Sequence, residues 1–132
     1  MNDRFKFRAY VKANEEIETV DVINFIDGCT EWGEPEIIVG GVGRTFDEVI
    51  LMQCTGLKDK NGTLIYEGDI VKFNFDTDEI KAVVSWDDKE LIGFYLNTTD
   101  YFKDKYVTDY DFYKNDYELI GNIYENPKLI KE

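Results

Sequence analysis

The sequence has no histidine, and its 132 residues include one serine and two cysteines. Without an imidazole, mechanisms that use histidine as a general base or a metal ligand are excluded. Ser85 lies within an apolar run rather than on the sharp turn that exposes a catalytic serine. Cys29 and Cys54 are too few for a disulfide framework or, without histidine, for a zinc site. We therefore expect free thiols, no catalytic residues, no metal site and no cofactor.

Long hydrophobic runs are also missing. No apolar stretch reaches the roughly 18 residues that suggest a transmembrane helix. The polar start MNDRFKFR does not have the pattern of a signal peptide. Thiols without a disulfide pattern are typical of a reducing compartment. These absences predict a cytoplasmic protein.

Basic residues are scarce relative to acidic ones: 15 Lys and Arg stand against 28 Asp and Glu, a net charge of −13. Up to residue 50 there are 5 basic and 11 acidic residues, and after it 10 and 17, so the excess is spread along the chain. Arg4, Lys6 and Arg8 alternate with Phe5 and Phe7. This pattern favours a solvated strand face over a nucleic-acid site. Anionic membrane surfaces are disfavoured by the same charge.

What the sequence does contain is β-strand signal with a large aromatic fraction, 15 % of the residues. Alternating or β-branched runs predict strands at 4–11, 17–26, 36–40, 68–75, 80–86, 91–98 and 117–125. Thr45 and Glu48 have capping-box spacing, which predicts one helical turn at 46–48 and then a strand. Residues 64–68 predict another helical turn that ends at Gly68, with positive φ at the glycine.

Many short strands are typical of a small barrel or sandwich. The apolar positions predict one buried barrel cluster, formed by Val71, Phe73, Val83, Trp86, Phe94, Leu96, Ile120 and Ile123.

Three kinds of motif invite a chemical interpretation. The glycine-rich run at 56–62 has five residues between Gly56 and Gly62 and continues with Thr63, so it fails the phosphate-loop pattern and indicates a turn. Acidic clusters at 76–79, 87–90 and 109–116 lack the donor pattern of a calcium loop and indicate solvated turns. A close pair of carboxylates has no specificity among 28 acids.

The segment 101–118 is unusually rich in Tyr and Asp. Aromatic rings beside carboxylates are typical of protein interfaces, so this acidic aromatic loop is our candidate for a protein-binding surface. The alternative is a partly exposed loop with a few rings in the core. The candidate residues are Tyr101, Phe102, Tyr106, Tyr110, Phe112 and Tyr113.

Residues 51–73 and 118–130 together resemble the YopX family of phage and prophage proteins. The signature is T-G-L-x-D-x-N-G followed by I-Y-E-G-D-I-V, and KFRAY, FDEVILMQ, SWDD and IGNIYENP occur in family order. Cys54 departs from the family, in which an aromatic residue is common at this position, and 76–116 matches loosely.

The resemblance implies a mostly β fold. It places an N-terminal β-rich (α+β) lobe at 1–54 and a C-terminal SH3-like barrel lobe, which carries the acidic aromatic loop, at 55–132. It also implies an origin in phages or prophages of low-GC Gram-positive bacteria, and hence the cytoplasm of a bacterial host. No catalytic residues are attached to the family, so none is carried over.

We expect a non-enzymatic module that binds a host or phage protein and does not bind a membrane. Two alternatives stay open: an acidic decoy that mimics DNA and occupies a DNA-binding protein, and an enzyme that uses carboxylates alone. Self-association into a homo-oligomer is also left open.

The charge predicts no measurable binding to single- or double-stranded DNA at physiological salt, because affinity for nucleic acid depends mainly on phosphate neutralisation. A titration with labelled oligonucleotides checks this. Micromolar affinity that falls steeply with added salt would show the charge argument to be wrong, and Arg4, Lys6 and Arg8 would then be the first residues to test.

Overall fold

The structure of the chain is a computed structural model that describes residues 3–24, 36–75, 78–88, 93–98, 105–106 and 117–130. It is mostly β, with antiparallel pairing throughout the described strands. The chain divides into two compact units, Met1–Gln53 and Cys54–Glu132.

In chain order the elements are η1 (Asp3–Phe5), β1 (Phe7–Val11), β2 (Glu16–Ile23), β3 (Ile37–Val39), β4 (Val42–Arg44), η3 (Phe46–Glu48), β5 (Val49–Lys58), β6 (Leu64–Tyr66), β7 (Asp69–Phe75), β8 (Asp78–Asp87), β9 (Gly93–Thr98), β10 (Lys105–Tyr106), β11 (Glu118–Asn122) and η4 (Pro127–Leu129). The three η elements are 3₁₀ turns of three residues each, and no helix in the described segments is long and apolar enough to cross a membrane.

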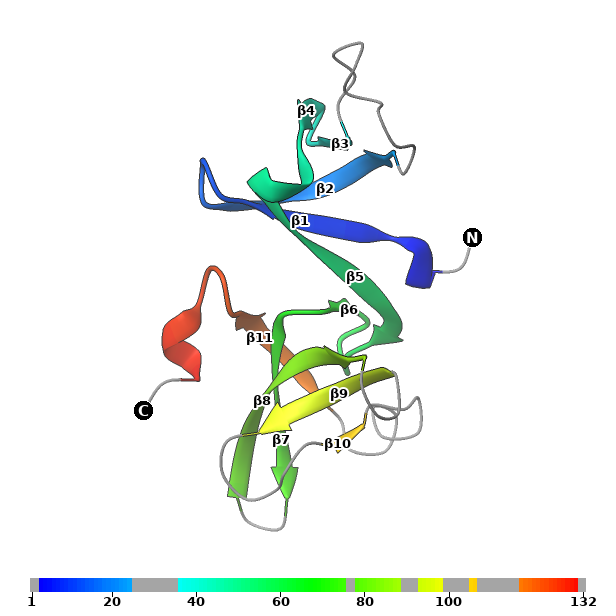
Figure 1. The fold of residues 1–132 in the computed structure, drawn as a ribbon. Helices are drawn as coiled ribbons and strands as arrows, with labels where there is room; N and C mark the ends of the chain where they lie inside the picture. Colours follow the sequence, from blue (N-terminus) through cyan, green and yellow to red (C-terminus); the bar gives the residue numbers. More distant parts are fainter. Residues whose placement is uncertain are drawn as a thin grey trace. The chain divides into compact units, whose positions relative to one another are not determined.

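The first unit is built on the strand order β4-β3-β2-β1-β5 (Figure 1). Strand β5 begins in this unit and continues into the second, where its last residues pair with β6. Alternate side chains of β1 and β3 point into one apolar cluster, as the two-residue period of a strand requires. The buried members are Ala9, Val11, Ile37, Val39 and Val49.

A two-residue hairpin turn joins β3 to β4. Val39 pairs with Val42, and the residues between them, Gly40 and Gly41, have φ of 57° and 81°. Positive φ at both central residues is the requirement of the hairpin turn whose twist matches that of the flanking strands, and glycine meets it without strain. The glycines at the end of the predicted strand 36–40 therefore form a turn that leads into β4, a strand that the sequence analysis did not predict.

The start of the chain differs from the prediction. The expected strand at 4–11 begins only at Phe7, because Asp3–Phe5 forms a 3₁₀ turn. The Lys6 amide donates to the Asp3 carbonyl, and Lys6 Nζ lies 3.1 Å from Asp3 Oδ1. Arg4 and Lys6 therefore do not share a strand face with Arg8, and Phe5 is 64 % exposed.

The predictions for 44–54 are confirmed. Residues 46–48 form a 3₁₀ turn, and β5 follows from Val49. The Thr45 amide donates to Glu48 Oε1 at 2.9 Å, which is the Glu48 half of the capping box. The Glu48 amide in turn donates to the Thr45 carbonyl at 3.1 Å.

The second unit contains the sheet β10-β9-β8-β7-β11 and the β5–β6 pair (Figure 1). One face of the sheet and Ile65 of β6 surround a hydrophobic cluster, against which Leu57, Phe94 and Leu119 pack. Its buried residues are Ile65, Val71, Phe73, Ile80, Ala82, Val84, Leu96 and Tyr117. The rings of Phe73 and Tyr117 meet edge to face with centroids 4.8 Å apart.

The predicted core is confirmed at Val71, Phe73 and Leu96, and Phe94 packs against the same cluster. Val83, Ile120 and Ile123 are only half-buried. Trp86 is 42 % exposed and was wrongly placed in the core.

The wrong placement of Val83 has a physical reason, whereas Trp86 alternates in phase with the buried set and lies near the end of the strand. Val83 and Val84 are both apolar, so either alternating set of β8 could face the core, and the structure buries the set of Ile80, Ala82 and Val84. Ile120 lies at a register shift between Leu119 and Gly121, where β11 departs from regular pairing.

The segment before β7 is not the predicted helical turn. Residues 64–66 form β6, and Glu67 and Gly68 make the turn into β7. The positive φ at Gly68 is confirmed, at 89°. Its amide donates to the Val84 carbonyl at 2.8 Å, and its carbonyl accepts from the Ile123 amide at 2.9 Å. Gly68 thus joins the turn to β8 and to the end of β11.

We expect Gly68→Ala to lower the free energy of unfolding by about 1–2 kcal/mol, because a Cβ is strained at this φ. Chemical denaturation measures the change. Gly93→Ala is the matched control: Gly93 is not among the positive-φ glycines, and a Cβ there meets nothing within 4 Å. An equal loss of stability in both variants would contradict the assignment of strain to Gly68.

Candidate partner-binding surface

Among the residues of the second unit whose side chains the structure describes, Trp86, near the end of β8, is the most exposed aromatic. Trp86 pairs directly across the sheet with Phe94 of β9, and their rings meet edge to face with centroids 4.9 Å apart and planes at 74°. Phe94 packs against the buried cluster. The pair therefore joins the core to the surface, and its outer member offers apolar area to a partner.

The next register pair, Ser85 and Tyr95, points its side chains to the other face of the sheet. Tyr95 follows Phe94 and is half-buried, and β10 places Tyr106 opposite Tyr95 at the sheet edge. Of the predicted loop residues, Tyr106 alone has a described backbone, and its side chain is not described. Tyr101, Phe102, Tyr110, Phe112 and Tyr113 lie outside the described residues.

Among the described residues of the second unit, four polar residues are buried: Thr55, Asp59, Asp69 and Asn122. Burying a polar group is costly unless it is hydrogen-bonded. Each of these side chains bonds to backbone groups that the strands do not use. Three of them lie within residues 55–73, the segment that contains the glycine-rich run at 56–62.

Asp59 has the densest set of these bonds. Its Oδ1 accepts from the amides of Asn61 and Thr63, both at 2.9 Å, which closes the turn after β5. Its Oδ2 accepts from the Leu119 amide of β11 at 3.0 Å. The Lys60 amide also donates to the Tyr117 carbonyl at 2.9 Å. One carboxylate thus shapes a turn and fastens it to a strand 60 residues away.

The other three act locally. The Thr55 hydroxyl donates to the Ile65 carbonyl at 2.8 Å and accepts from the Leu57 amide at 3.0 Å. Asp69 Oδ2 accepts from the Tyr66 amide at 2.8 Å, across the turn at Gly68.

Asn122 organises the turn that follows β11. Its Oδ1 accepts from the amides of Tyr124 and Glu125, and its Nδ2 donates to Glu125 Oε1 at 2.9 Å. Sequence analysis identified the turn at 56–62 but missed these anchors, and its predicted strand at 117–125 wrongly ran through the turn at 123–125, because β11 ends at Asn122. The spacing D-x-N-G was the available signal, because an Asp side chain commonly bonds to the amide two residues on.

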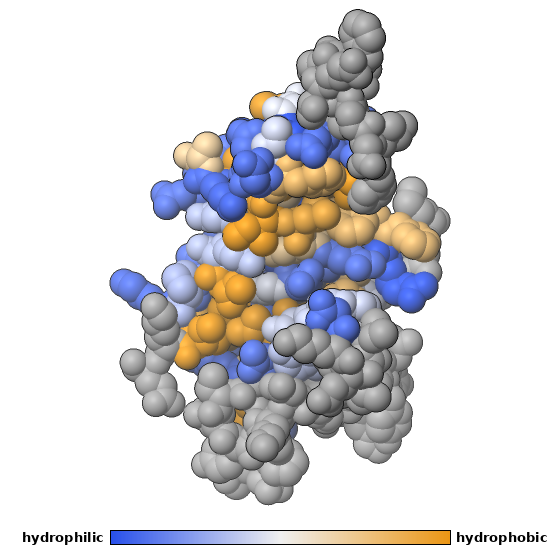
Figure 2. All heavy atoms as spheres, in the orientation of Figure 1, coloured by the Kyte–Doolittle hydropathy of each residue, from blue (hydrophilic) through white to orange (hydrophobic). Residues whose placement is uncertain are grey.

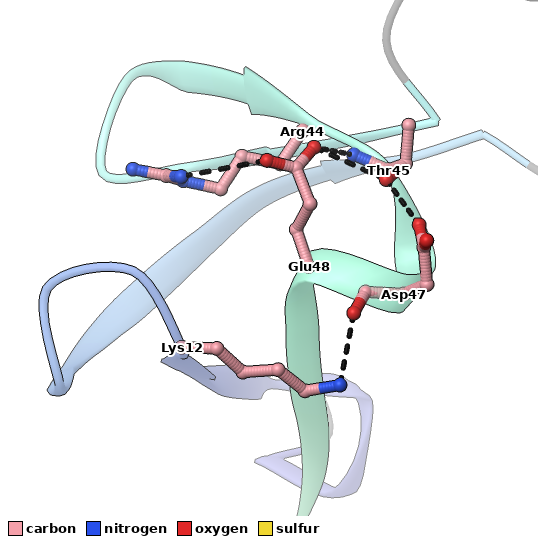
Figure 3. A network of polar contacts seen from close by, with 5 residues as sticks. All are labelled: Lys12, Arg44, Thr45, Asp47 and Glu48. Atoms are coloured by element: carbon pink, nitrogen blue, oxygen red, sulfur yellow. Dashed lines mark hydrogen bonds and ion pairs between the residues drawn. The ribbon is translucent and has the colours of Figure 1, made fainter.

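A second polar network surrounds η3 in the first unit (Figure 3). The Thr45 hydroxyl donates to Asp47 Oδ1 and lies 3.1 Å from Glu48 Oε1. Lys12 Nζ donates to the Asp47 carbonyl at 2.9 Å, and Arg44 lies 3.9 Å from Glu48 Oε2. The network fixes the turn that leads into β5.

These contacts lower two acid pKa values. The Thr45 hydroxyl is the main cause of the lowered pKa of Asp47, and the Thr45 amide is the main cause of the lowered pKa of Glu48. Both carboxyl groups are exposed.

The acidic clusters do not converge on a metal centre within the described segments, where no group of three or more potential ligands could hold an ion. Glu79 instead lies 3.8 Å from Lys72 Nζ, and Lys72 lies 3.3 Å from Glu118. Of the cluster at 87–90, Asp88 is described and exposed, and the cluster at 109–116 lies outside the described residues.

Hydrophobic residues of the second unit also reach the surface around β11 and the C-terminal turn, where Figure 2 shows them in orange. Half-buried side chains in this region include Ile120, Ile123 and Leu129.

The described fold and surface are those of a small, mostly β protein with two units, whose buried polar groups serve the backbone. The chain belongs to the YopX family: the family model described as YopX protein matches residues 6–131. It is similar over nearly its whole length to the crystal structure of protein EF1440 from Enterococcus faecalis. That comparison gives 28 % identity and a TM-score of 0.65, and covers 96 % of this chain and 97 % of the other. No match was found among curated proteins.

Replacing Asp59 should weaken the second unit. We expect Asp59→Asn to lower the free energy of unfolding by about 2 kcal/mol, because an amide keeps one acceptor oxygen and turns an N–H group toward backbone donors. Chemical denaturation checks this, with Asp88→Asn as the control for loss of one negative charge on an exposed side chain. Equal stability of the two variants would contradict the anchoring role.

The η3 network predicts a specific titration. In Thr45→Val, the pKa of Asp47 should rise toward its ordinary value near 3.9, and the pKa of Glu48 should rise less because its main partner is the remaining Thr45 amide. Carboxyl-carbon NMR titration measures both. Because both pKa values are lowered, the stabilisation of this turn is present above about pH 4.5 and is lost as the pH falls through the folded-state values. A larger change at Glu48 than at Asp47 would contradict this account.

Proposed function

We propose that this chain is a protein of phage or prophage origin that acts as a non-enzymatic protein-binding module. The observation that carries the proposal is the Trp86–Phe94 pair, in which an exposed indole rests on a ring that packs against the core. Interfaces concentrate their binding energy in aromatic anchors of this kind, and tryptophan is prominent among them. The aromatic residues predicted at 101–113 are proposed as a second contact surface, because Tyr106 pairs with Tyr95, whose side chain points to the opposite face of the sheet from Phe94.

The proposal of a binding role, rather than catalysis, is supported by the use of the buried polar groups. Thr55, Asp59, Asp69 and Asn122 are all engaged by backbone partners. A general acid or base must be within reach of a substrate proton. Asp59 and Asp69 are buried by the turns that they hold, so neither is presented to a substrate.

We further propose that the second unit is an SH3-like barrel. Its sheet ends at β11 on one side, and the turn after β5 bonds to β11 through Asp59 and Lys60. These bonds supply the closure that a barrel needs to remove an open edge. The β5–β6 pair and Gly68 complete the connection to the sheet.

We expect the immobilised protein to capture a specific protein from the lysate of a low-GC Gram-positive bacterium such as Enterococcus faecalis. Capture should depend on Trp86, because its apolar area is the anchor. Wild type, Trp86→Ala and Val42→Ala are compared by quantitative mass spectrometry; Val42 is 50 % exposed, belongs to the first unit and is the matched control.

A protein retained by wild type and Val42→Ala and lost by Trp86→Ala supports the proposal. Equal recovery of the captured protein by wild type, Trp86→Ala and Val42→Ala would contradict the proposal. Repeating the capture at raised salt separates the acidic decoy, because a contact that depends mainly on charge weakens strongly as salt screens it.

A further inference from the structure

Trp86 has two properties of a preformed contact. It is 42 % exposed, and Phe94 holds its ring in an edge-to-face contact at 4.9 Å. Phe94 is itself fixed by packing against the buried cluster. Because a partner would not have to immobilise a freely rotating indole, the entropy cost of binding is reduced.

The negative charge of the chain narrows the chemistry of a partner that contacts Trp86. The chain carries a net charge of −13, and the residues 76–116 contain 11 acidic and 5 basic side chains. Two positions beyond Trp86, Asp88 is exposed. Complementary potentials favour a basic segment of the partner and disfavour an acidic one.

An exposed indole in an acidic chain distinguishes the two basic side chains. The guanidinium of arginine is planar and weakly hydrated, so it stacks on an aromatic face and can still donate to a carboxylate. The ammonium of lysine is strongly hydrated and loses more on leaving water. We propose that Trp86 is the contact for an arginine side chain in a basic segment of the protein partner; this inference rests on the proposed function.

The test uses two peptides of equal charge, hexa-arginine and hexalysine, with calorimetry at physiological salt. The lysine peptide reports the general attraction to an acidic protein. We expect wild type to bind the arginine peptide roughly two- to five-fold more tightly than the lysine peptide. In a Trp32→Phe background Trp86 is the remaining tryptophan, and its fluorescence should change on addition of the arginine peptide.

Trp86→Ala should remove the preference for arginine, Trp86→Phe should reduce it because phenylalanine binds cations less strongly than tryptophan, and Val42→Ala should keep it. Thermal unfolding verifies that each variant is folded, and the conservative Trp86→Phe variant keeps the inference testable if Trp86→Ala unfolds. Equal affinity of wild type for both peptides, or a preference that survives in Trp86→Phe and Trp86→Ala, overturns the inference. If partner capture still requires Trp86 while the peptides bind equally, this inference fails and the proposed function stands.

Discussion

The second unit depends on one carboxylate. The buried Asp59 side chain accepts hydrogen bonds from two amides of its own turn and from the Leu119 amide of β11. The adjacent bond from Lys60 reaches Tyr117, whose ring packs on Phe73 in the core. A residue that joins a local turn to a distant strand sets the position of β11 and, through it, one wall of the hydrophobic cluster. Side-chain bonds to backbone amides are used here because the turn has no neighbouring strand to pair with.

This use of polar side chains for backbone hydrogen bonds explains why the residues of the family signature do not indicate a catalytic activity. Its polar members Thr55, Asp59 and Asp69 satisfy backbone groups, and Gly68 supplies a conformation that other residues adopt with strain. A long, specific motif therefore identifies the fold of a YopX protein and gives no catalytic assignment. The feature of the surface that suggests a binding role lies outside the signature: Trp86 exposes apolar area in a strongly acidic chain.

Local signals predicted some elements well and others badly, for reasons visible at single residues. The capping-box spacing of Thr45 and Glu48 depends on bonds within four residues, and the turn formed where it was expected. Positive φ at Gly68 was likewise a local property. Residues 64–66 form a strand rather than the predicted helical turn because β5 pairs with them. Phe5 lies outside the predicted strand because the Lys6 amide bonds to the Asp3 carbonyl and closes a turn. The loop candidates at 101–113 could be proposed from composition alone, whereas the contact between Trp86 and Phe94 depends on strand register.

By itself the sequence determined the mostly β character, the YopX family and the turns at 46–48 and 56–62, because these follow from alternation, from capping and Asx chemistry, and from a long motif. It also determined the charge, which is a sum over residues and independent of the fold. Tertiary structure decided which face of β8 is buried, since Val83 and Val84 are equally apolar and only the packing of Ile80, Ala82 and Val84 against Leu96 distinguishes them. It also decided that Asp59 is an anchor and that Trp86 is exposed. Both depend on residues far away in the chain, and a local pattern does not contain that information.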